Sequence, residues 1–407
     1  MQIDIKHNTK KCNGKLSITG SKSETNRLLL LQGLISGFEI KNKSNSEDSR
    51  LMEAALSSKA KVIDINHAGT AMRFLTAYFS QVDGREVLLT GSKRMQERPI
   101  KILVDALNFM GAKITYENKN GYPPLHIKGK NLKGGSVCLP ADISSQFISA
   151  LIMIGPFIEK GIELKLTGKI TSKSYINMTL LLLERFGVET IFDGQIITVK
   201  HKHNPIKIDQ IVESDWSSAS YIFSIVALSE ESEISLKTFK SKSLQGDSII
   251  RDIYKKLGVT SDFKGKNLIL KKENIKLPKK IFYDLSNSPD IAQTIAVTCY
   301  GLGVECELVG LHTLKIKETD RLLALQTELR KLGANISITE NSLFLYSNSS
   351  FINNCSIATY NDHRMAMAFA PLSIISPLSI QDPSVVSKSY PDFWNDLIQL
   401  GFNIKNR

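Results

Sequence analysis

An internal repeat constrains the fold of this chain more than any other feature of its sequence. Positions spaced 73 residues apart each stand at the start of an apolar run typical of a buried helix. These positions are Ser144, Ser217, Asp290 and His363. Runs of the same character begin at Ser23 and Ala68, so six units are expected. A repeat of this period indicates an array of small structural units.

A second marker has nearly the same period. A glycine follows a large apolar residue at intervals of 68 to 76 residues, at positions 111, 187, 258, 333 and 401. This pattern predicts the C-terminus of a helix followed by a return strand. Short β-rich segments lie between the helices, at residues 161–167, 195–199, 233–237, 267–271 and 342–346. Each unit should therefore run strand, helix, strand, helix, strand, strand, which makes the chain an α/β protein.

Six similar units divide most simply into two similar domains of three units each. A length of 407 residues agrees with two or three domains. A polar stretch at residues 211–215 lies near the middle of the chain, and we expect the domain boundary near residue 213.

The composition is that of a folded protein with an excess of positive charge. Lys and Arg number 52 against 40 Asp and Glu, a formal net charge of +12 that favours an anionic partner. Many lysines lie in polar turns without neighbouring aromatic residues, so nucleic acid is not the expected partner. Five scattered cysteines include no CxxC pair and are expected to be reduced. No apolar stretch reaches the roughly 18 to 20 residues of a membrane span, and the N-terminus lacks the apolar core of a secretory signal. We expect a cytoplasmic protein.

Several familiar catalytic motifs are absent from the sequence, which contains no P-loop, no GxGxxG after a strand, no HExxH and no GxSxG. Their absence argues against nucleotide hydrolysis, hydride transfer, zinc proteolysis and serine hydrolysis. His201 and His203 alternate on an expected strand without a third ligand nearby, so we interpret them as surface residues and expect no metal site.

The tripeptide Ser-Lys-Ser occurs four times, at residues 21–23, 172–174, 241–243 and 387–389. The first copy should open the first helix of the chain, and the other three should open the second helix of a unit. One copy alone could be a serine cap with a solvated lysine. Recurrence at helix entrances favours anion binding by free backbone N–H groups together with an ammonium group.

Cations and hydroxyls gather at these expected helix starts, and the carboxylates Asp290 and Glu318 lie among them. If the helix N-termini of both domains face one cleft, that cleft collects the charge and backbone donors that suit small organophosphates. Two carboxylates supply the groups needed for general acid and base catalysis. Taken singly, these expected helix starts also have purely structural interpretations. Such a start can be a capping box, a proline in the first helical turn or an i,i+4 charge pair.

Nine short motifs follow one another along nearly the whole chain. They are GSKSETNR (20–27), AGTAMR (68–73), LTGSKRMQERPI (89–100), SSQF (144–147), SKSY (172–175), SPDIA (288–292), KETDRL (317–322), NDHRMAM (361–367) and SKSYPDF (387–393). Together they resemble the signatures of the 5-enolpyruvylshikimate-3-phosphate synthase family, also named 3-phosphoshikimate 1-carboxyvinyltransferases.

The resemblance implies a transferase of chorismate and aromatic amino acid biosynthesis. Such an enzyme moves the enolpyruvyl group of phosphoenolpyruvate to the 5-hydroxyl of shikimate 3-phosphate and releases phosphate, by addition and elimination through a tetrahedral intermediate. The resemblance implies no metal and no organic cofactor. It also implies two domains of three βαβαββ units each, at residues 21–212 and at 1–20 plus 213–407. We expect a monomer that binds these two small molecules and neither nucleic acid nor membrane.

The resemblance also assigns roles, motif by motif. The first domain would carry most of the shikimate 3-phosphate site, and the second would carry the catalytic carboxylates and most phosphoenolpyruvate contacts. Asp290 would accept the proton of the attacking hydroxyl, Glu318 would protonate the methylene carbon, and Lys22 would touch both substrates. The shikimate 3-phosphate residues would be Lys22, Ser23, Arg27, Ser144, Ser145, Gln146, Ser172, Tyr175, Asp290 and Lys317. The phosphoenolpyruvate residues would be Lys22, Gly69, Arg94, Gln146, Arg321, Arg364 and Lys388.

Two positions depart from the family pattern. His67 stands where the family usually has asparagine before Ala-Gly-Thr, and Thr313 stands where it usually has asparagine four residues before the KETDR lysine. Neither change removes a cation or a catalytic carboxylate, so we expect the activity to be retained. For Arg27→Ala we expect weaker shikimate 3-phosphate binding with little change in stability.

Two alternative functions stay open at this point. The first is the related enolpyruvyl transferase that acts on UDP-N-acetylglucosamine, a family that generally carries a reactive cysteine in its mobile loop. This chain has no cysteine at the corresponding residues 91–95. The second is an RNA-binding or RNA-end-modifying protein of similar fold, which the positive charge would favour and which predicts binding with a steep salt dependence.

Overall fold

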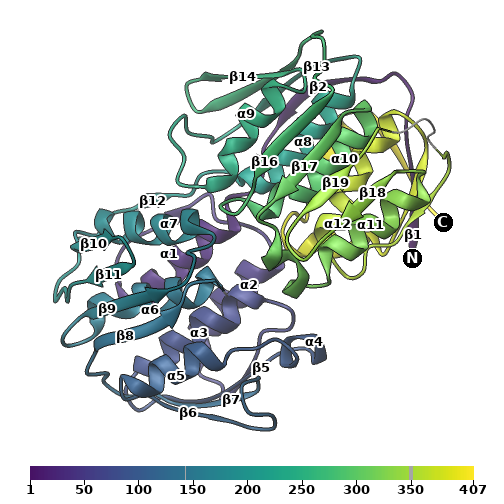
Figure 1. Cartoon of the computed structure of the whole chain (residues 1–407). Helices are drawn as coiled ribbons and strands as arrows, with labels where there is room; N and C mark the ends of the chain where they lie inside the picture. The colour runs from purple at the N-terminus through teal and green to yellow at the C-terminus, as the bar shows by residue number, and fades with distance from the viewer. Residues whose placement is uncertain (143, 348–351) are drawn as a thin grey trace. The chain divides into compact units, whose positions relative to one another are not determined.

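The structure is a computed structural model that describes residues 1–142, 144–347 and 352–407. Its internal contacts divide the chain into two compact units. Gly20–Val212 form one, which we call the inserted unit; Met1–Thr19 and Glu213–Arg407 together form the other, which we call the split unit. Figure 1 shows helices and twisted strands interleaved in each. The chain thus leaves the split unit after two strands and returns to it at residue 213.

The inserted unit contains two four-stranded sheets, each with one parallel and two antiparallel pairs. Their orders are β4-β5-β7-β6 and β10-β11-β9-β8. The parallel pairs, β4 with β5 and β8 with β9, need helical crossovers, whereas the last two strands of each sheet form a hairpin. This is the predicted order of elements. The strands are β4 (Val62–Asp64), β5 (Glu86–Thr90), β6 (Lys113–Tyr116), β7 (Leu125–Lys128), β8 (Gly135–Pro140), β9 (Ile162–Thr167), β10 (Thr190–Asp193) and β11 (Ile196–Val199).

Several helices of the inserted unit begin at a serine that caps them. The side chain of Ser21 accepts the backbone N–H of Glu24, and that of Ser46 accepts the N–H of Ser49. The helices are α1 (Lys22–Leu34), α2 (Glu47–Ser57), α3 (Gly69–Gln81), α4 (Lys93–Gln96), α5 (Lys101–Phe109), α6 (Ser145–Ile154), the short 3-10 helix η1 (Gly155–Phe157) and α7 (Lys173–Arg185).

The first repeat departs from the prediction of six equal units. Its helices α1 and α2 form, but within the described residues its strand β3 (Ile40–Lys41) pairs only with β12 (Gln210–Ile211), as a two-residue parallel ladder. The first two strands of the chain complete sheets of the split unit instead. The repeat is therefore regular in its helices and incomplete in its sheet.

The split unit contains three four-stranded sheets of the same design, in the orders β14-β15-β13-β2, β16-β17-β19-β18 and β20-β21-β1-β22. The parallel pairs are β13 with β2, β16 with β17 and β20 with β21. The strands are β1 (Gln2–His7), β2 (Lys11–Leu16), β13 (Glu231–Leu236), β14 (Val259–Lys264), β15 (Asn267–Lys272), β16 (Lys280–Asp284), β17 (Glu305–Val309), β18 (Ile336–Ile338), β19 (Leu343–Leu345), β20 (Ser356–Ile357), β21 (Leu378–Gln381) and β22 (Phe402–Asn406). The helical segments are α8 (Trp216–Leu228), η2 (Gly246–Ile249), α9 (Ile250–Lys255), η3 (Pro289–Ile291), α10 (Ala292–Leu302), η4 (His312–Ile316), α11 (Arg321–Lys331), α12 (His363–Phe369), η5 (Ala370–Ile374), η6 (Pro383–Lys388) and α13 (Phe393–Gln399).

In the split unit the 73-residue repeat brings three equivalent helices into one core. In the split unit α8, α10 and α12 contact one another and are almost wholly buried, which explains why their sequences are apolar on all faces. Small polar residues join them: Ser220 bonds Thr294 at 3.0 Å, and Thr298 donates to Ser224 at 2.7 Å. Paired hydroxyls let the helices approach closely without leaving buried donors unsatisfied.

The predicted helix ends and strands are largely confirmed. All five marker glycines have positive φ, between 74° and 103°, the conformation that glycine adopts most easily after a helix. The five β-rich segments correspond to β9, β11, β13, β15 and β19. His201 and His203 are exposed, as predicted, but the strand assignment was wrong because β11 ends at Val199.

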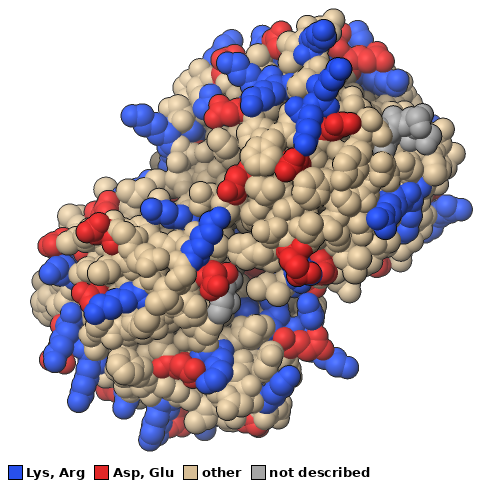
Figure 2. Space-filling view, in the orientation of Figure 1, with Lys and Arg blue, Asp and Glu red and all other residues tan. Residues whose placement is uncertain are grey.

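The surface and the cysteines agree with the composition. On the face that Figure 2 shows, Lys and Arg are interspersed with Asp and Glu and form no continuous basic field. The five cysteines are free thiols. Among the helices of the described residues, none is both long enough and apolar enough to span a membrane.

Candidate active site

Arg27 lies where three helices of the inserted unit meet. Its side chain, one turn into α1, is 2% exposed, and Nε donates to Oγ1 of Thr179 at 2.7 Å. The terminal nitrogens donate to Oγ of Ser149 at 3.0 Å and to the carbonyls of Ser23 and Tyr175 at 2.9 and 3.3 Å. Ser149 is on α6, and Tyr175 and Thr179 are on α7. The guanidinium of Arg27 therefore joins α1, α6 and α7.

The environment of Arg27 makes it a structural residue as well as a candidate ligand for an anion. Its four hydrogen-bond acceptors are neutral oxygens, and its guanidinium stacks over the rings of Phe74 and Tyr175. Burial lowers the pKa of Arg27 to about 10. The expectation that Arg27→Ala would leave stability unchanged therefore no longer holds, because four internal bonds depend on this side chain.

The predicted residues of α6 lie against the start of α3. Ser144 caps α6 by accepting the backbone N–H of Gln146 at 3.3 Å, and Nε2 of Gln146 donates to Oγ1 of Thr70 at 3.1 Å. Thr70 follows Gly69, the first residue of α3, and Ser145 is buried in the first turn of α6. Thr70 and Gln146 are 76 residues apart in the sequence. The side-chain amide of Gln146 thus holds the two helix starts together.

Ser172 precedes α7 in a left-handed backbone conformation, with φ 53° and ψ 38°. It is buried, and its side chain does not cap the helix, whereas its carbonyl accepts the N–H of Tyr175 at 3.0 Å. A residue other than glycine pays of order 1–3 kcal/mol for such a backbone. Strain of this kind at a predicted substrate contact is typical of a preorganised binding site.

Lys22 and Arg94, the two predicted cations for phosphoenolpyruvate in this unit, differ in their pairing. Nζ of Lys22 lies 3.6 Å from Oδ2 of the buried Asp48 on α2, a neighbour that the sequence did not identify. Arg94 on α4 lies 3.1 Å from Glu97, the residue that follows this helix, and the side chain of Arg94 is 47% exposed. An exposed pair contributes little stability, so Arg94 can turn to a bound anion at small cost.

The two positions that depart from the family pattern lie beside predicted residues. Nδ1 of His67 is 2.7 Å from Oγ of Ser92, the hydroxyl that caps α4. His67 therefore links the Ala-Gly-Thr segment to the start of α4, the short helix that carries Arg94. Thr313 lies in η4, four residues before Lys317, and is buried.

Arg321 is the centre of a carboxylate cluster in the split unit. Its guanidinium, 2% exposed, donates from Nε to Oδ2 of Asp362 at 2.6 Å. The terminal nitrogens donate to Oδ1 of Asp290 at 2.9 Å and to Oε2 of Glu318 at 2.8 Å. One arginine thus bridges the two carboxylates that were predicted to be catalytic.

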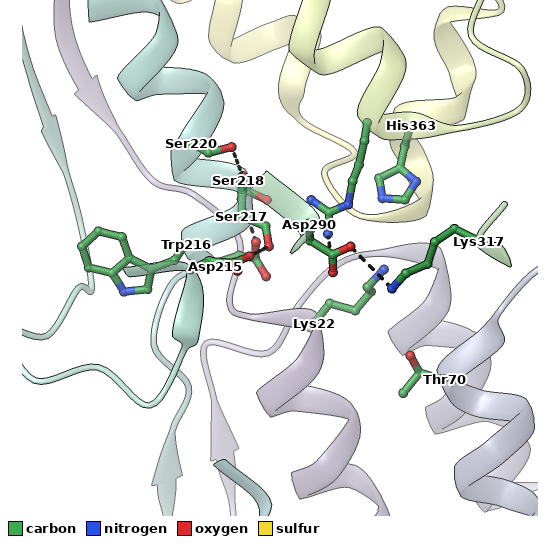
Figure 3. Close-up of polar contacts among 12 residues, drawn as sticks. Lys22, Thr70, Asp215, Trp216, Ser217, Ser218, Ser220, Asp290, Lys317 and His363 are labelled. Carbon is green, nitrogen blue, oxygen red and sulfur yellow. Dashed lines mark hydrogen bonds and ion pairs between the residues drawn. The ribbon is translucent and has the colours of Figure 1, made fainter. Parts of the chain in front are cut away.

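Three further cations surround these carboxylates. Arg364 and Lys317 lie 3.3 and 3.6 Å from oxygens of Asp290, and Lys388 lies 2.9 Å from Oε1 of Glu318. Figure 3 shows Lys317 pointing toward the carboxylate of Asp290. All the site residues that the sequence predicted for the split unit therefore lie in one charged network.

The network fixes the protonation of its members. Burial alone would raise the pKa of Asp290, but Arg364, Lys317 and Arg321 outweigh it and hold that pKa well below its usual range. Burial also lowers the pKa of Lys317, and the two arginines act in the same direction. Asp290 is therefore ionised at neutral pH, which is the state that can accept a proton.

Sequence reasoning missed Asp362, which orients two of the predicted arginines. It is 0% exposed, binds Arg321 through its side chain and accepts the backbone N–H of Arg364 at 2.8 Å as the cap of α12. Tyr221 on α8 contacts the same region, since its hydroxyl accepts a bond from Arg364 at 3.4 Å. The NDHR motif contains the cap, but nothing local to it identifies Arg321 as its partner.

The four Ser-Lys-Ser copies are not equivalent. Those at 21–23 and 172–174 lead into α1 and α7, as predicted. Ser243 instead donates to the buried carboxylate of Glu213 at 2.6 Å, and η2 begins only at Gly246. The copy at 387–389 overlaps the end of η6, and α13 begins at Phe393. The prediction of a helix entrance was wrong for these two copies, because distant partners decide the use of the tripeptide.

Comparisons with known proteins agree with these motifs. A family model described as EPSP synthase (3-phosphoshikimate 1-carboxyvinyltransferase) matches residues 39–397. The 3-phosphoshikimate 1-carboxyvinyltransferase of Bacteroides fragilis (strain YCH46) is 44% identical over 396 residues, which cover 96% of each chain. The enzyme of the same name from Buchnera aphidicola subsp. Cinara cedri is 36% identical over 423 residues, which cover 95% of this chain and 94% of the relative.

Solved structures support the fold. An EPSP synthase from Acinetobacter baumannii superposes with a TM-score of 0.79 at 21% identity and covers 100% of both chains. The enolpyruvyl transferase NikO from Streptomyces tendae gives a TM-score of 0.75 at 13% identity and covers 99% of this chain and 98% of its own. The predicted α/β class and the predicted resemblance are both confirmed, and the chain belongs to the EPSP synthase family.

Proposed function

We propose that this chain transfers the enolpyruvyl group of phosphoenolpyruvate to the 5-hydroxyl of shikimate 3-phosphate and releases phosphate. The activity is the one that the names of its relatives state, and it would serve chorismate and aromatic amino acid biosynthesis. The alternatives with UDP-N-acetylglucosamine or RNA are not favoured by these relatives. We further propose that the enzyme works as a cytoplasmic monomer, with the two substrates as its partners.

The observation that carries the proposal is the bridging of Asp290 and Glu318 by Arg321, with bonds of 2.9 and 2.8 Å. Addition of an alcohol to an enol phosphate needs one group to accept the hydroxyl proton and another to protonate the methylene carbon. It also needs cations at the carboxylate and phosphate of the substrate, which Arg321, Arg364 and Lys388 would supply; their ion pairs with Asp290 and Glu318 support this role.

Asp290 is the proposed base. In the addition step the hydroxyl oxygen bonds to the central carbon of phosphoenolpyruvate, and its proton passes to Asp290. The low pKa of Asp290 keeps it ionised but makes it a weak base, so the proton transfer must be coupled to bond formation at carbon. Lys317, 3.6 Å from Asp290, would hold the same substrate.

Glu318 is the proposed acid. Its two oxygens are bound by Lys388 at 2.9 Å and Arg321 at 2.8 Å, which favours the carboxylate while no substrate is present. An arriving phosphoenolpyruvate would draw these cations toward its own negative groups and make Glu318 easier to protonate. The methylene carbon then gains the proton, which completes a tetrahedral ketal phosphate. Loss of a methyl proton with cleavage of the phosphate C–O bond gives the enolpyruvyl ether and free phosphate.

The inserted unit would supply the remaining contacts. Its helix entrances, gathered by Arg27 and by the amide of Gln146, present hydroxyls and backbone N–H groups that suit the 3-phosphate and ring hydroxyls of shikimate 3-phosphate. The proposed ligands are Lys22, Ser23, Arg27, Ser144, Ser145, Gln146, Ser172 and Tyr175. Lys22 and Gln146 would also reach phosphoenolpyruvate, together with Gly69 and Arg94.

A coupled assay of phosphate release from phosphoenolpyruvate tests the proposal. We expect release with shikimate 3-phosphate and none with UDP-N-acetylglucosamine. Release only with the UDP-sugar would establish the alternative transferase. No release with either acceptor, together with RNA binding that weakens steeply with salt, would establish the RNA-binding alternative. Gel filtration with light scattering tests the proposed monomeric state, because it gives the molar mass of the protein in solution.

A further inference from the structure

Asp247 is a buried carboxyl group beside the catalytic cluster that the mechanism above does not use. It lies in η2, is 4% exposed, and accepts a hydrogen bond from the hydroxyl of Ser217. Ser217 belongs to the first turn of α8, where Asp215 caps the helix by accepting the N–H of Ser218 at 2.7 Å. Figure 3 shows Asp215 and Ser217 at this helix end and Asp290 next to them.

The surroundings of Asp247 differ from those of the other buried carboxylates of the cluster. Asp290, Glu318 and Asp362 each bind at least one cation, whereas within the described residues no Lys, Arg or His side chain forms an ion pair with Asp247. A buried carboxylate without a cation is costly, whereas a neutral carboxylic acid is buried at a much lower cost. The burial of Asp247 and the lack of a paired cation among the described residues therefore favour the neutral acid.

The groups that face Asp247 come from three elements. They are Asp215 and Ser217 from α8, Asp290 from η3 and Arg364 from α12. Burial first, and then the negative charges of Asp290 and Asp215, raise the pKa of Asp247 to about 7, against the smaller opposing effects of Ser217 and Arg364. This raised pKa agrees with the burial of Asp247 and with its lack of a paired cation in the described part of the chain.

We propose that Asp247 is a positioning residue that is protonated in the form of the enzyme that binds phosphoenolpyruvate best, and so leaves Arg364 to Asp290 and to that substrate. An ionised Asp247 would place a second carboxylate near Arg364 and compete with Asp290 for it. The added negative charge would also repel the phosphate and carboxylate of the incoming substrate. The inference rests on the proposed function, because it concerns affinity for phosphoenolpyruvate.

The KM for phosphoenolpyruvate as a function of pH tests the inference, with kcat followed in parallel. In the parent enzyme we expect KM to rise roughly 3-fold to 10-fold between pH 7 and 9, with a smaller change in kcat. In Asp247→Asn, which keeps the shape but has no proton to lose, the rise should disappear. Asp252→Asn changes an exposed carboxylate of α9 and should keep the parent profile. Superimposable profiles of the parent and Asp247→Asn would overturn the inference.

A second variant and a second measurement do not depend on the folding of Asp247→Asn or on activity. The Ser217 hydroxyl stabilises the ionised form, so Ser217→Ala should move the rise in KM to higher pH; a move to lower pH would overturn the inference. In ligand-free protein at pH 6, infrared spectroscopy should detect the carbonyl stretch of a buried carboxylic acid, shifted in Ser217→Ala and missing from Asp247→Asn. The infrared band can behave as expected while neither shikimate 3-phosphate nor UDP-N-acetylglucosamine supports phosphate release. In that case the proposed reaction is wrong, but Asp247 is still a buried carboxylic acid. If phosphate release proceeds and the band persists in Asp247→Asn, the proposed function is kept and only the inference about Asp247 is refuted.

Discussion

Replacing Arg27 with alanine should destabilise the inserted unit as well as weaken substrate binding. The side chain makes four hydrogen bonds, and at about 1.5 kcal/mol for each bond to a charged group their loss costs roughly 6 kcal/mol. Burial lowers the pKa of Arg27 to about 10, a penalty of roughly 3 kcal/mol that alanine relieves. The expected net loss of unfolding free energy is therefore about 2–3 kcal/mol, or roughly 5–10 °C in Tm.

Thermal melting and equilibrium binding of shikimate 3-phosphate, measured on the same variants, check this prediction. Arg94→Ala is the matched control, because Arg94 is a half-exposed arginine of the same unit; its melting temperature should stay within about 1 °C of the parent. Arg27→Met, which keeps most of the packing, should bind shikimate 3-phosphate as poorly as Arg27→Ala but lose less stability. An unchanged melting temperature for Arg27→Ala would refute the reasoning.

Four further outcomes are expected. Glu318→Gln should lose about 100-fold to 10,000-fold in turnover and stop solvent exchange of the phosphoenolpyruvate methylene hydrogens; exchange at the parent rate would assign the acid to another residue. Ser172→Gly should raise the free energy of unfolding in urea by about 1 kcal/mol while weakening shikimate 3-phosphate binding, and a loss of stability would show that no strain is stored there. Asp362→Asn should cost about 3–5 kcal/mol of stability and raise the KM for phosphoenolpyruvate, because Arg321 loses its closest partner. Because the pKa of Asp247 is about 7 in the native state and about 3.9 when unfolded, the native state holds the extra proton between these values. Stability should therefore fall as pH rises from about 4 to 7, and urea unfolding of Asp247→Asn should show a flatter dependence.

Local patterns were enough to predict much of the fold. The glycines that end helices and the helices that start 73 residues apart are recognisable because capping and apolar periodicity act over a few neighbouring residues. The split unit's predicted site residues also lie together, although Lys388 ends a 3-10 helix and does not stand at a helix entrance. Nothing in the periodicity indicated that the first repeat would lack its own four-stranded sheet, because strand partners are chosen across the whole chain.

The roles of single side chains inside the site were harder to predict. The sequence identifies Arg27 only as a candidate ligand of shikimate 3-phosphate in the first helix, and the packing of α6 and α7 reveals that it is buried. Asp362 and Asp247 are a cap and a turn residue in the sequence, and their importance comes from partners 41 and 30 residues away, Arg321 and Ser217. Burial and long-range pairing therefore set the electrostatics that the motifs leave open.

The pairing of β1 with β22 and of β2 with β13 has a consequence for biosynthesis. Residues 2–7 leave the ribosome long before their partner at residues 402–406. At about 5–20 residues per second, β1 remains without that partner for roughly 20–80 s, during which the inserted unit can fold completely. The nascent chain thus carries two open strand edges for most of its synthesis, which makes its first nineteen residues a natural place for a chaperone to protect against aggregation.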